Sequence, residues 1–295
     1  MIMNSFIDIS FNKFYNIRNN MLHKGVFIMV FPPLFWLMLA VCLLVSAIGF
    51  KNYVWFISLG YGFSIAAEGV AMLLLYGKTL TAGTVICCLL LVAYGLRLGG
   101  YLAIRERKSA SYAKTMQGEI KDGKTIPFGV KVSIWITCAA LYVTQVIPVF
   151  YRLHNSSGSN GFTYIGAAVM AFGLFFESLA DLQKNAAKKN NPRRFVDTGL
   201  YRIVRCPNYL GEMVFWTGVL ISGIGALRGI GQWIMALIGY IGIIYVMFSG
   251  ARRLEIRQNR NYGSNPDYQT YVRTVPILVP LIPLYTLEKH KWLVA

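Results

Sequence analysis

Apolar residues in this chain fall into separated runs of about twenty, the length that an α-helix needs to cross the hydrocarbon core of a membrane. The composition agrees with this pattern, because 56% of the 295 residues are hydrophobic and 14% are charged, where a soluble domain has about a quarter charged. A water-soluble fold is therefore disfavoured. We expect an all-α polytopic membrane protein, a bundle of about seven transmembrane helices.

The apolar runs place the expected spans along the chain. They lie at residues 26–50, 53–76, 79–97, 130–151, 162–181, 209–227 and 230–250. Residues 1–25 form a polar and aromatic N-terminal segment, and residues 26–295 form a single membrane domain. The charge-poor, turn-rich loop at residues 151–161 divides it into an earlier group of helices, 26–151, and a later group, 162–295.

Positive charge is concentrated at the ends of the apolar runs. The formal charge is +17, but the basic residues cluster at 97–131, 184–205 and 252–291, which is typical of cytoplasmic loops and not of a nucleic-acid-binding surface. Placing these clusters in the cytoplasm puts the C-terminus there too, and the membrane lipids are then expected partners. The cysteines show no zinc-ligand spacing, so we expect no metal. Because the basic residues lie at the ends of apolar runs, we do not expect a nucleic acid as a partner either.

Four acidic residues lie within or at the edge of an expected span. A charged side chain at the centre of a bilayer costs about 2.5 to 3.5 kcal/mol on insertion scales, so such acids normally face a bundle interior or a watery cavity. Glu68 lies in the second span, Glu177 and Asp181 end the fifth on one helix face, and Glu212 opens the sixth. We expect the last three to meet at one membrane face. The alternative is that they form ordinary interfacial pairs with nearby lysines and arginines.

The segment between the fifth and sixth spans is rich in groups that bind phosphates and ribose. Residues 184–209 read KNAAKKNNPRRFVDTGLYRIVRCPNY, and they supply cations, amides and turn formers between two acid-bearing helices. Arginine and lysine suit phosphate, whereas carboxylates and asparagine suit ribose hydroxyls and an amide. This combination is what a dinucleotide phosphate requires.

Two further stripes accompany this segment. After the last span, Arg252, Arg253 and Arg257 occupy nearly adjacent turns, and the spaced aromatics Tyr262, Tyr268 and Tyr271 indicate an ordered cap. The alternative for this basic cluster is a positive-inside anchor that binds anionic lipid.

At the end of the third span, Tyr94, Arg97, Tyr101 and Arg105 share one helical face. That stripe fits either an interfacial belt or a site in which a tyrosine donates to a carbonyl oxygen.

These segments resemble a known family. The stretches FESLADLQKNAAKKNNPRRFVDTGLYRIVRCPNYLGEMVFW, LRLGGYLAIRERK and LEIRQNRNYGSNPDYQTYVRTVPILVP resemble the DUF1295 branch of the steroid 5α-reductase family, over most of residues 53–283. The resemblance implies a seven-helix membrane bundle in which NADPH enters from the cytoplasm between the later helices. It also implies a lipid-like enone substrate among the earlier helices.

The resemblance assigns expected roles to individual residues. Those implied to hold NADPH are Asp181, Arg194, Asn208 and Glu212, with Glu177 and Lys188 on the cofactor side. We add Arg252, Arg253, Arg257 and Tyr271 from the cap. Tyr94 resembles the tyrosine of the substrate pocket, with Glu68 or Arg97 as its orienting group. Two departures stand out: Cys206 replaces a histidine of the usual motif, and the pocket acid of steroid 5α-reductases has no equivalent early in the second span.

The hypothesis from sequence is a reductase of a carbon–carbon double bond. NADPH would give a hydride to an enone in a sterol-like or other lipid, and Tyr94 would stabilise the charge that develops on the carbonyl oxygen. Two alternatives stay open. One is an S-adenosylmethionine-dependent methyltransferase of the isoprenylcysteine type, which the Asn208 position and the single Glu255 disfavour. The other is a non-enzymatic transporter or lipid-binding membrane protein.

Overall fold

The structure is a computed structural model that describes residues 31–108 and 125–293. The fold is helical throughout these residues. Eight α-helices and three short 3₁₀ helices follow one another there. The α-helices are α2 (Pro33–Ser46), α3 (Leu59–Leu75), α4 (Ala82–Lys108), α6 (Phe128–His154), α7 (Gly161–Asn190), α8 (Pro207–Ser222), α9 (Gly229–Tyr262) and α10 (Pro266–Thr274). The 3₁₀ helices are η1 (Ala47–Phe50), η2 (Tyr53–Phe56) and η3 (Gly199–Arg202). The expected N-terminal segment 1–25 lies outside the described residues.

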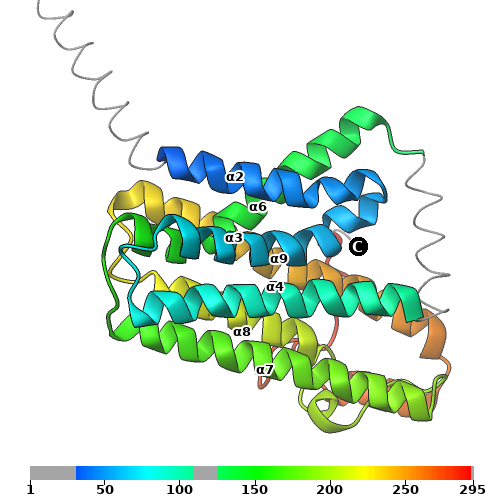
Figure 1. The fold of residues 1–295 in the computed structure, drawn as a ribbon. Coiled ribbons are helices and arrows are strands. Elements are labelled where there is room, and N and C mark those ends of the chain that lie inside the picture. Colours follow the sequence, from blue (N-terminus) through cyan, green and yellow to red (C-terminus); the bar gives the residue numbers. More distant parts are fainter. Residues whose placement is uncertain (1–30, 109–124, 294–295) are drawn as a thin grey trace, which may run out of the picture.

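The long helices form one bundle in which consecutive members run in opposite directions (Figure 1). Within the described residues, six helical stretches are long and apolar enough to cross a membrane. The expected sixth span is α8, which has 16 residues and is about 24 Å long at 1.5 Å per residue. It is thus shorter than a usual span and packs inside the bundle between α7 and α9. The expectation of a polytopic helical membrane bundle is confirmed.

Hydrogen bonds tie the connecting segments together at each end of the bundle. At one end, Arg152 in the last turn of α6 donates to the carbonyls of Ser222 and Ile224 at 2.6 and 2.7 Å, which joins the end of α6 to the end of α8 and the loop after it. At the other end, the Trp55 indole donates to Glu106 at 3.0 Å. The described parts of the three basic clusters lie at this second end, so we call it the basic end.

Small residues allow the closest helix contacts. A Cβ atom on Gly173 of α7 would lie 2.4 Å from the backbone nitrogen of Phe215 in α8, and one on Gly95 of α4 would lie 2.3 Å from the carbonyl oxygen of Gly62 in α3. Such backbone proximity is common between membrane helices, because lipid gives little hydrophobic drive for their association and packing must supply it. The α7–α8 contact brings the end of α7 beside the start of α8, where the expected acids lie.

Three helices extend past the expected spans on the basic end. The helix at the span expected at 79–97 is α4, which begins at Ala82 and continues to Lys108. The span at 162–181 is part of α7, which continues to Asn190, and the span at 230–250 is part of α9, which continues to Tyr262. The hydrophobic pattern predicts where a helix leaves the membrane, and it carries no signal for where the helix itself ends. Residues 184–190, expected in a connecting segment, are therefore helical.

The chain after α9 forms a cap over the basic end. The backbone nitrogens of Arg205 and Cys206 donate to the carbonyls of Pro276 and Ile277, both at 2.9 Å, so the segment after α10 lies beside the start of α8. Leu287 then donates to Glu255 at 2.7 Å, and the final described residues return along α9. The ordered cap expected from the spaced tyrosines and prolines is present.

Candidate functional site

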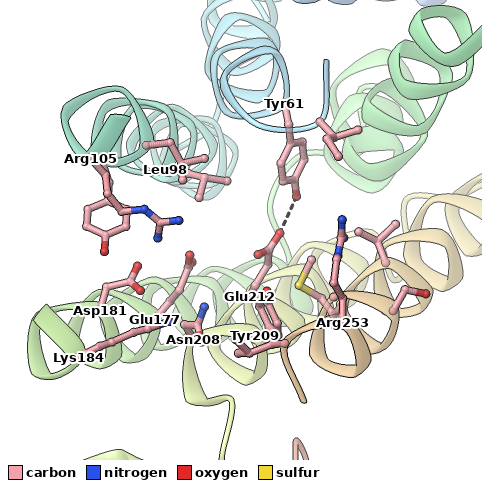
Figure 2. Close-up of a pocket in the computed structure, with 18 of the residues that line it drawn as sticks. Tyr61, Leu98, Arg105, Glu177, Asp181, Lys184, Asn208, Tyr209, Glu212 and Arg253 are labelled. Carbon is pink, nitrogen blue, oxygen red and sulfur yellow. Dashed lines mark hydrogen bonds between the residues drawn. The ribbon is translucent and has the colours of Figure 1, made fainter. Parts of the chain in front are cut away.

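A cavity of about 460 Å³ opens among α3, α4, α7, α8 and α9 near the basic end (Figure 2). Its lining residues are Ile57, Tyr61, Leu98, Tyr101, Leu102, Arg105, Glu177, Asp181, Lys184, Asn208, Tyr209, Glu212, Tyr245, Val246, Met247, Ser249, Gly250, Arg253, Leu254 and Arg257. On α9 the lining runs from Tyr245 to Arg257, about 18 Å along the helix axis. A volume of this order is typical of small-molecule sites, which occupy about 300 to 1,000 Å³.

The cavity changes in charge along its length. The direction of each helix shows that Tyr61 and Glu212 lie towards the interior of the bundle, whereas Lys184 and Arg257 lie towards the basic end. The deep part is therefore rich in oxygen acceptors and the outer part is rich in cations. A ligand that fits such a cavity carries donors or positive charge at one end and negative charge at the other.

Arg97 joins the two acids of α7. Its guanidinium forms ion pairs with Glu177 and with Asp181, and it also donates to the Glu177 carbonyl at 3.1 Å. The two acids lie one helical turn apart, so a single guanidinium spans both. Arg97 was expected to orient Tyr94, but its observed partners are the two acids expected to hold the cofactor. It thus fixes the α7 wall of the cavity against α4.

Glu212 is held at the deep end by two tyrosines. Its Oε1 accepts from the Tyr94 hydroxyl at 2.7 Å and from the Tyr61 hydroxyl at 3.0 Å, and the two hydroxyl oxygens are 2.9 Å apart. The Trp216 indole donates to the Tyr61 oxygen at 2.9 Å. Tyr94 is wholly buried and stacks on Phe215, with ring centroids 4.3 Å apart. Only Tyr61 of the two tyrosines lines the cavity, and Figure 2 shows it pointing towards Glu212.

The buried hydroxyl of the cavity-lining Ser249 on α9 has no hydrogen-bond partner in the described chain, and neither do two buried acceptor atoms on cavity-lining residues of α7 and α8. They are Oδ1 of Asn208 and Oε2 of Glu177. Burying an oxygen acceptor without a hydrogen bond costs about 1 to 3 kcal/mol, so native proteins rarely leave such atoms unpaired. Both residues lie on the wall formed by α7 and α8. A ligand with N–H or O–H donors would satisfy them.

The structure brings together six of the residues expected to bind the cofactor. Glu177, Asp181, Asn208, Glu212, Arg253 and Arg257 all line the cavity. Tyr101 and Arg105, from the stripe on α4, line it as well. The two arginines of α9 share a face because residues four apart on a helix differ by only about 40°. Their neighbour Arg252 is about 100° away and faces elsewhere.

Four other expected cofactor residues lie away from the cavity. Lys188 donates to the carbonyls of Pro192 and Arg194 at 3.2 and 2.6 Å and so holds the loop after α7. Arg194 is exposed and pairs with Asp197 at 2.8 Å. Arg252 binds the carbonyls of Glu288 and Leu293 in the C-terminal segment. Lys188 and Arg194 thus bind within the loop after α7 and Arg252 binds the C-terminal segment, so the count of basic residues near the motif overstates the number available to a ligand.

Tyr271 and Glu68 are also absent from the cavity wall. The Tyr271 hydroxyl donates to the Tyr201 carbonyl at 2.8 Å, and burial raises its pKa. Glu68 is fully buried in α3, and neither of its carboxylate oxygens has a partner that meets hydrogen-bond geometry. It lies two turns along α3 from Tyr61. Glu212, and not Glu68, is the acid that contacts Tyr94.

Two cavity residues escaped the sequence analysis. Tyr61 lies in an apolar span and counts as a hydrophobic residue, so nothing in the local pattern distinguishes it from a packing tyrosine. Lys184 was assigned to a connecting segment. The absence of glycine and proline between Asp181 and Pro192 could have indicated that α7 continues and carries Lys184 onto the face of Asp181.

Cys206, at the start of α8, is an unreactive group in this site. It is buried, and burial raises the pKa of its thiol to about 12, so the thiol stays protonated at neutral pH. It replaces the histidine of the family motif without supplying a nucleophile. Among residues 31–108 and 125–293, no three His, Cys, Asp or Glu side chains are placed to hold a metal ion together.

Comparisons with known proteins give one positive result. No curated protein and no solved structure matches the chain. A family model described as "Protein of unknown function (DUF1295)" matches residues 45–275, which include α3 to α10 and every residue that lines the cavity. This protein therefore belongs to the DUF1295 family.

Proposed function

We propose that this membrane protein is an NADPH-dependent reductase of a carbon–carbon double bond in a lipid-like enone. The observation that carries the proposal is the charge gradient of the cavity, from buried acceptors at its deep end to cations at its outer end. The resemblance of its motifs to steroid 5α-reductases supplies the reaction class. The orientation expected from the basic clusters would open the site to the cytoplasm.

The outer end suits the phosphate groups of a dinucleotide. Arg253, Arg257, Lys184 and Arg105 line it. Arginine binds phosphate through two parallel hydrogen bonds. Four cations at one end of the cavity are more than a ligand with a single carboxylate would need. The three phosphates of NADPH match this excess of positive charge.

The α7–α8 wall suits the hydroxyl and amide groups of the same cofactor. The unpaired Oδ1 of Asn208 and Oε2 of Glu177 need donors, which ribose hydroxyls and a carboxamide provide. When bound, NADPH would supply a hydride, and the nearby carboxylates would favour the positive charge that remains on its ring. The apolar lining around Leu98 and Met247 keeps the deep part of the cavity poor in water.

Tyr61 is the proposed donor to the substrate. Tyr61 lines the cavity, and its hydroxyl accepts from Trp216 while it donates to Glu212. Rotation of the O–H bond away from Glu212 would direct it to a carbonyl oxygen, where negative charge develops during reduction. Tyr94, the tyrosine expected from sequence, lies behind Glu212 and would position that carboxylate. Tyr94 would then be a positioning residue and Tyr61 the catalytic one.

A methyltransferase that uses S-adenosylmethionine is the second candidate. The carboxylates at the deep end would also suit a sulfonium cation, and the outer cations would bind its single carboxylate. The test is ligand-induced stabilisation of the detergent-purified full chain, because a ligand that binds only the folded state raises the melting temperature. NADPH should raise it and S-adenosylmethionine should not. The reverse result would assign the methyltransferase, and no shift with either would reject both enzymes.

Charge-matched variants locate the binding site. Arg253→Gln and Arg257→Gln should each weaken NADPH binding, since each loses a cation that lines the cavity. Arg260→Gln removes the same charge from an exposed position of α9 off the cavity and should bind NADPH like the parent. Glu212→Gln and Asp181→Asn should weaken NADPH binding with little loss of folded yield. Equal effects of all three arginine variants would indicate a general charge effect and not this site.

A further inference from the structure

A second, apolar groove lies on the opposite side of α9 from the charged cavity. Its lining residues are Ile241, Ile244, Tyr245, Phe248, Leu284, Leu287, His290, Trp292 and Leu293, around a volume of about 390 Å³. One wall is α9 and the other is the C-terminal segment 284–293, which we call the strap. Apart from Tyr245 at the border, the groove shares no residue with the charged cavity.

Several hydrogen bonds hold the strap against α9. Arg252 donates to the carbonyls of Glu288 and Leu293, and the Tyr245 hydroxyl donates to the carbonyl of Trp292 at 3.0 Å. Leu287 and Leu293 are 2% and 0% exposed, so they anchor the strap from within. The groove is thus a built feature of the fold with a fixed outer wall. It is not a gap beside a loose terminus.

The groove lies at the level of the membrane boundary. Ile241, Ile244 and Phe248 belong to the apolar part of α9, before its first arginine at position 252. The strap runs from the level of Glu255 back to the level of Tyr245, that is, from the basic end towards the hydrocarbon core. Tyr245 and Trp292 border it, and their rings are 6.1 Å apart, as in the aromatic belts of membrane interfaces.

Two lysines flank the groove-lining residue His290 in sequence. Lys289, His290 and Lys291 are consecutive and exposed on the strap. The neighbouring acid, Glu288, accepts from the Asn259 amide at 2.8 Å. A lipid whose chain lies in the groove would have these two exposed lysines near it on the strap, and their charge favours a negative headgroup.

We propose that this groove holds one hydrocarbon chain of an anionic phospholipid whose headgroup lies against Lys289 and Lys291. The lipid would fix the strap and α9 at the membrane surface. This binding site is independent of any reaction in the charged cavity. Two lysines near an anionic headgroup should give a preference of about 5- to 30-fold over a zwitterionic lipid.

Fluorescence quenching tests the site directly. Trp292 lines the groove, and bromine atoms on an acyl chain quench a tryptophan that they touch. The full chain is placed in phosphatidylcholine vesicles that contain a low, increasing fraction of brominated phosphatidylglycerol or brominated phosphatidylcholine. Subtracting the signal of Trp292→Phe isolates this residue from the other five tryptophans. Trp292 should be quenched at a severalfold lower fraction of the phosphatidylglycerol.

Variants separate a binding site from ordinary contact with the bilayer. Lys289→Gln combined with Lys291→Gln should abolish the preference for phosphatidylglycerol, whereas Lys189→Gln combined with Arg193→Gln, exposed elsewhere on the basic end, should preserve it. Ile244→Phe should fill the groove and make quenching follow the bulk lipid fraction. Equal quenching by both lipids in the parent protein, in proportion to their fraction, would overturn the proposal.

Discussion

Tyr94 of α4 donates its hydroxyl hydrogen to Glu212 of α8 across a distance of 2.7 Å, inside the bundle and away from the cavity surface. A hydroxyl has one hydrogen, so while this bond lasts Tyr94 has none to give to a substrate. The cavity-lining neighbour Tyr61 contacts the same carboxylate oxygen at 3.0 Å. The two tyrosines therefore differ in access to the cavity although they share a partner.

The first prediction separates these two tyrosines. Tyr94→Phe removes a donor from a buried carboxylate and should destabilise the protein by about 1 to 3 kcal/mol. Tyr61→Phe should lower kcat for an enone substrate by about two to three orders of magnitude with little change in KM, because it removes a donor that matters most in the transition state. Unfolding in detergent and steady-state kinetics measure the two effects. A larger loss of kcat in Tyr94→Phe would return the catalytic role to Tyr94.

A second prediction concerns the close contact of α7 and α8. Gly173→Ala would place a Cβ atom 2.4 Å from the backbone nitrogen of Phe215, so the helices must separate. We expect a loss of about 1 to 3 kcal/mol in stability, the usual cost of overpacking. Gly129→Ala, where a Cβ atom meets nothing within 4 Å, is the control and should not be destabilised. Comparable melting temperatures for the two variants would contradict this account of the packing.

Much of the fold was predictable because a membrane imposes one strong constraint. Each apolar run of about twenty residues has to form a helix, so a helix lies at each expected span in the described residues. The second span begins with η2 before it becomes α3, and the helix at the sixth, α8, ends at Ser222, five residues before the expected end. Residues outside the hydrocarbon have no such constraint. The helical extension to Asn190 and the path of the strap depend on local capping and on contacts distant in sequence, which hydropathy does not record.

The candidate site was only partly predictable for a related reason. The acids Glu177, Asp181 and Glu212 stood out because a charge in a span is costly, and they do gather at one cavity. Basic residues outside the membrane carry no such cost, so sequence could not distinguish Arg253, which lines the cavity, from Arg252, which binds the strap. Tyr61 was missed because tyrosine is common in apolar spans, and its place in the cavity wall follows from three-dimensional contacts alone.

A third prediction tests the membrane orientation with introduced cysteines. Ser156→Cys lies in the α6–α7 loop and Arg193→Cys in the loop at the basic end, both at exposed positions. In intact cells a charged, impermeant maleimide should label Ser156→Cys only, and Arg193→Cys should react after the membrane is opened. The native Cys206 should stay silent in folded protein even at pH 8, because its thiol has a pKa of about 12 and little thiolate is present. Labelling of both introduced cysteines from outside would contradict this topology.

The last prediction concerns Arg97, which joins the acids Glu177 and Asp181 to α4. Arg97→Met leaves two largely buried carboxylates without their cation, and breaking a buried pair in this way typically costs about 3 to 5 kcal/mol. Adding Glu177→Gln and Asp181→Asn to this variant should restore much of the stability, because no unpaired charge then remains. Equilibrium unfolding in detergent measures each step.

The exposed ion pair of Arg194 and Asp197 supplies the control for this experiment. Arg194 is 48% exposed, so water already solvates its charge, and a surface pair of this kind contributes only about 0 to 1 kcal/mol. Arg194→Met should therefore change stability little. If Arg97→Met cost no more than Arg194→Met, the guanidinium between α4 and α7 would be solvated like a surface group. The α7 wall of the cavity would then depend on helix packing alone, through contacts such as that of Gly173 with Phe215.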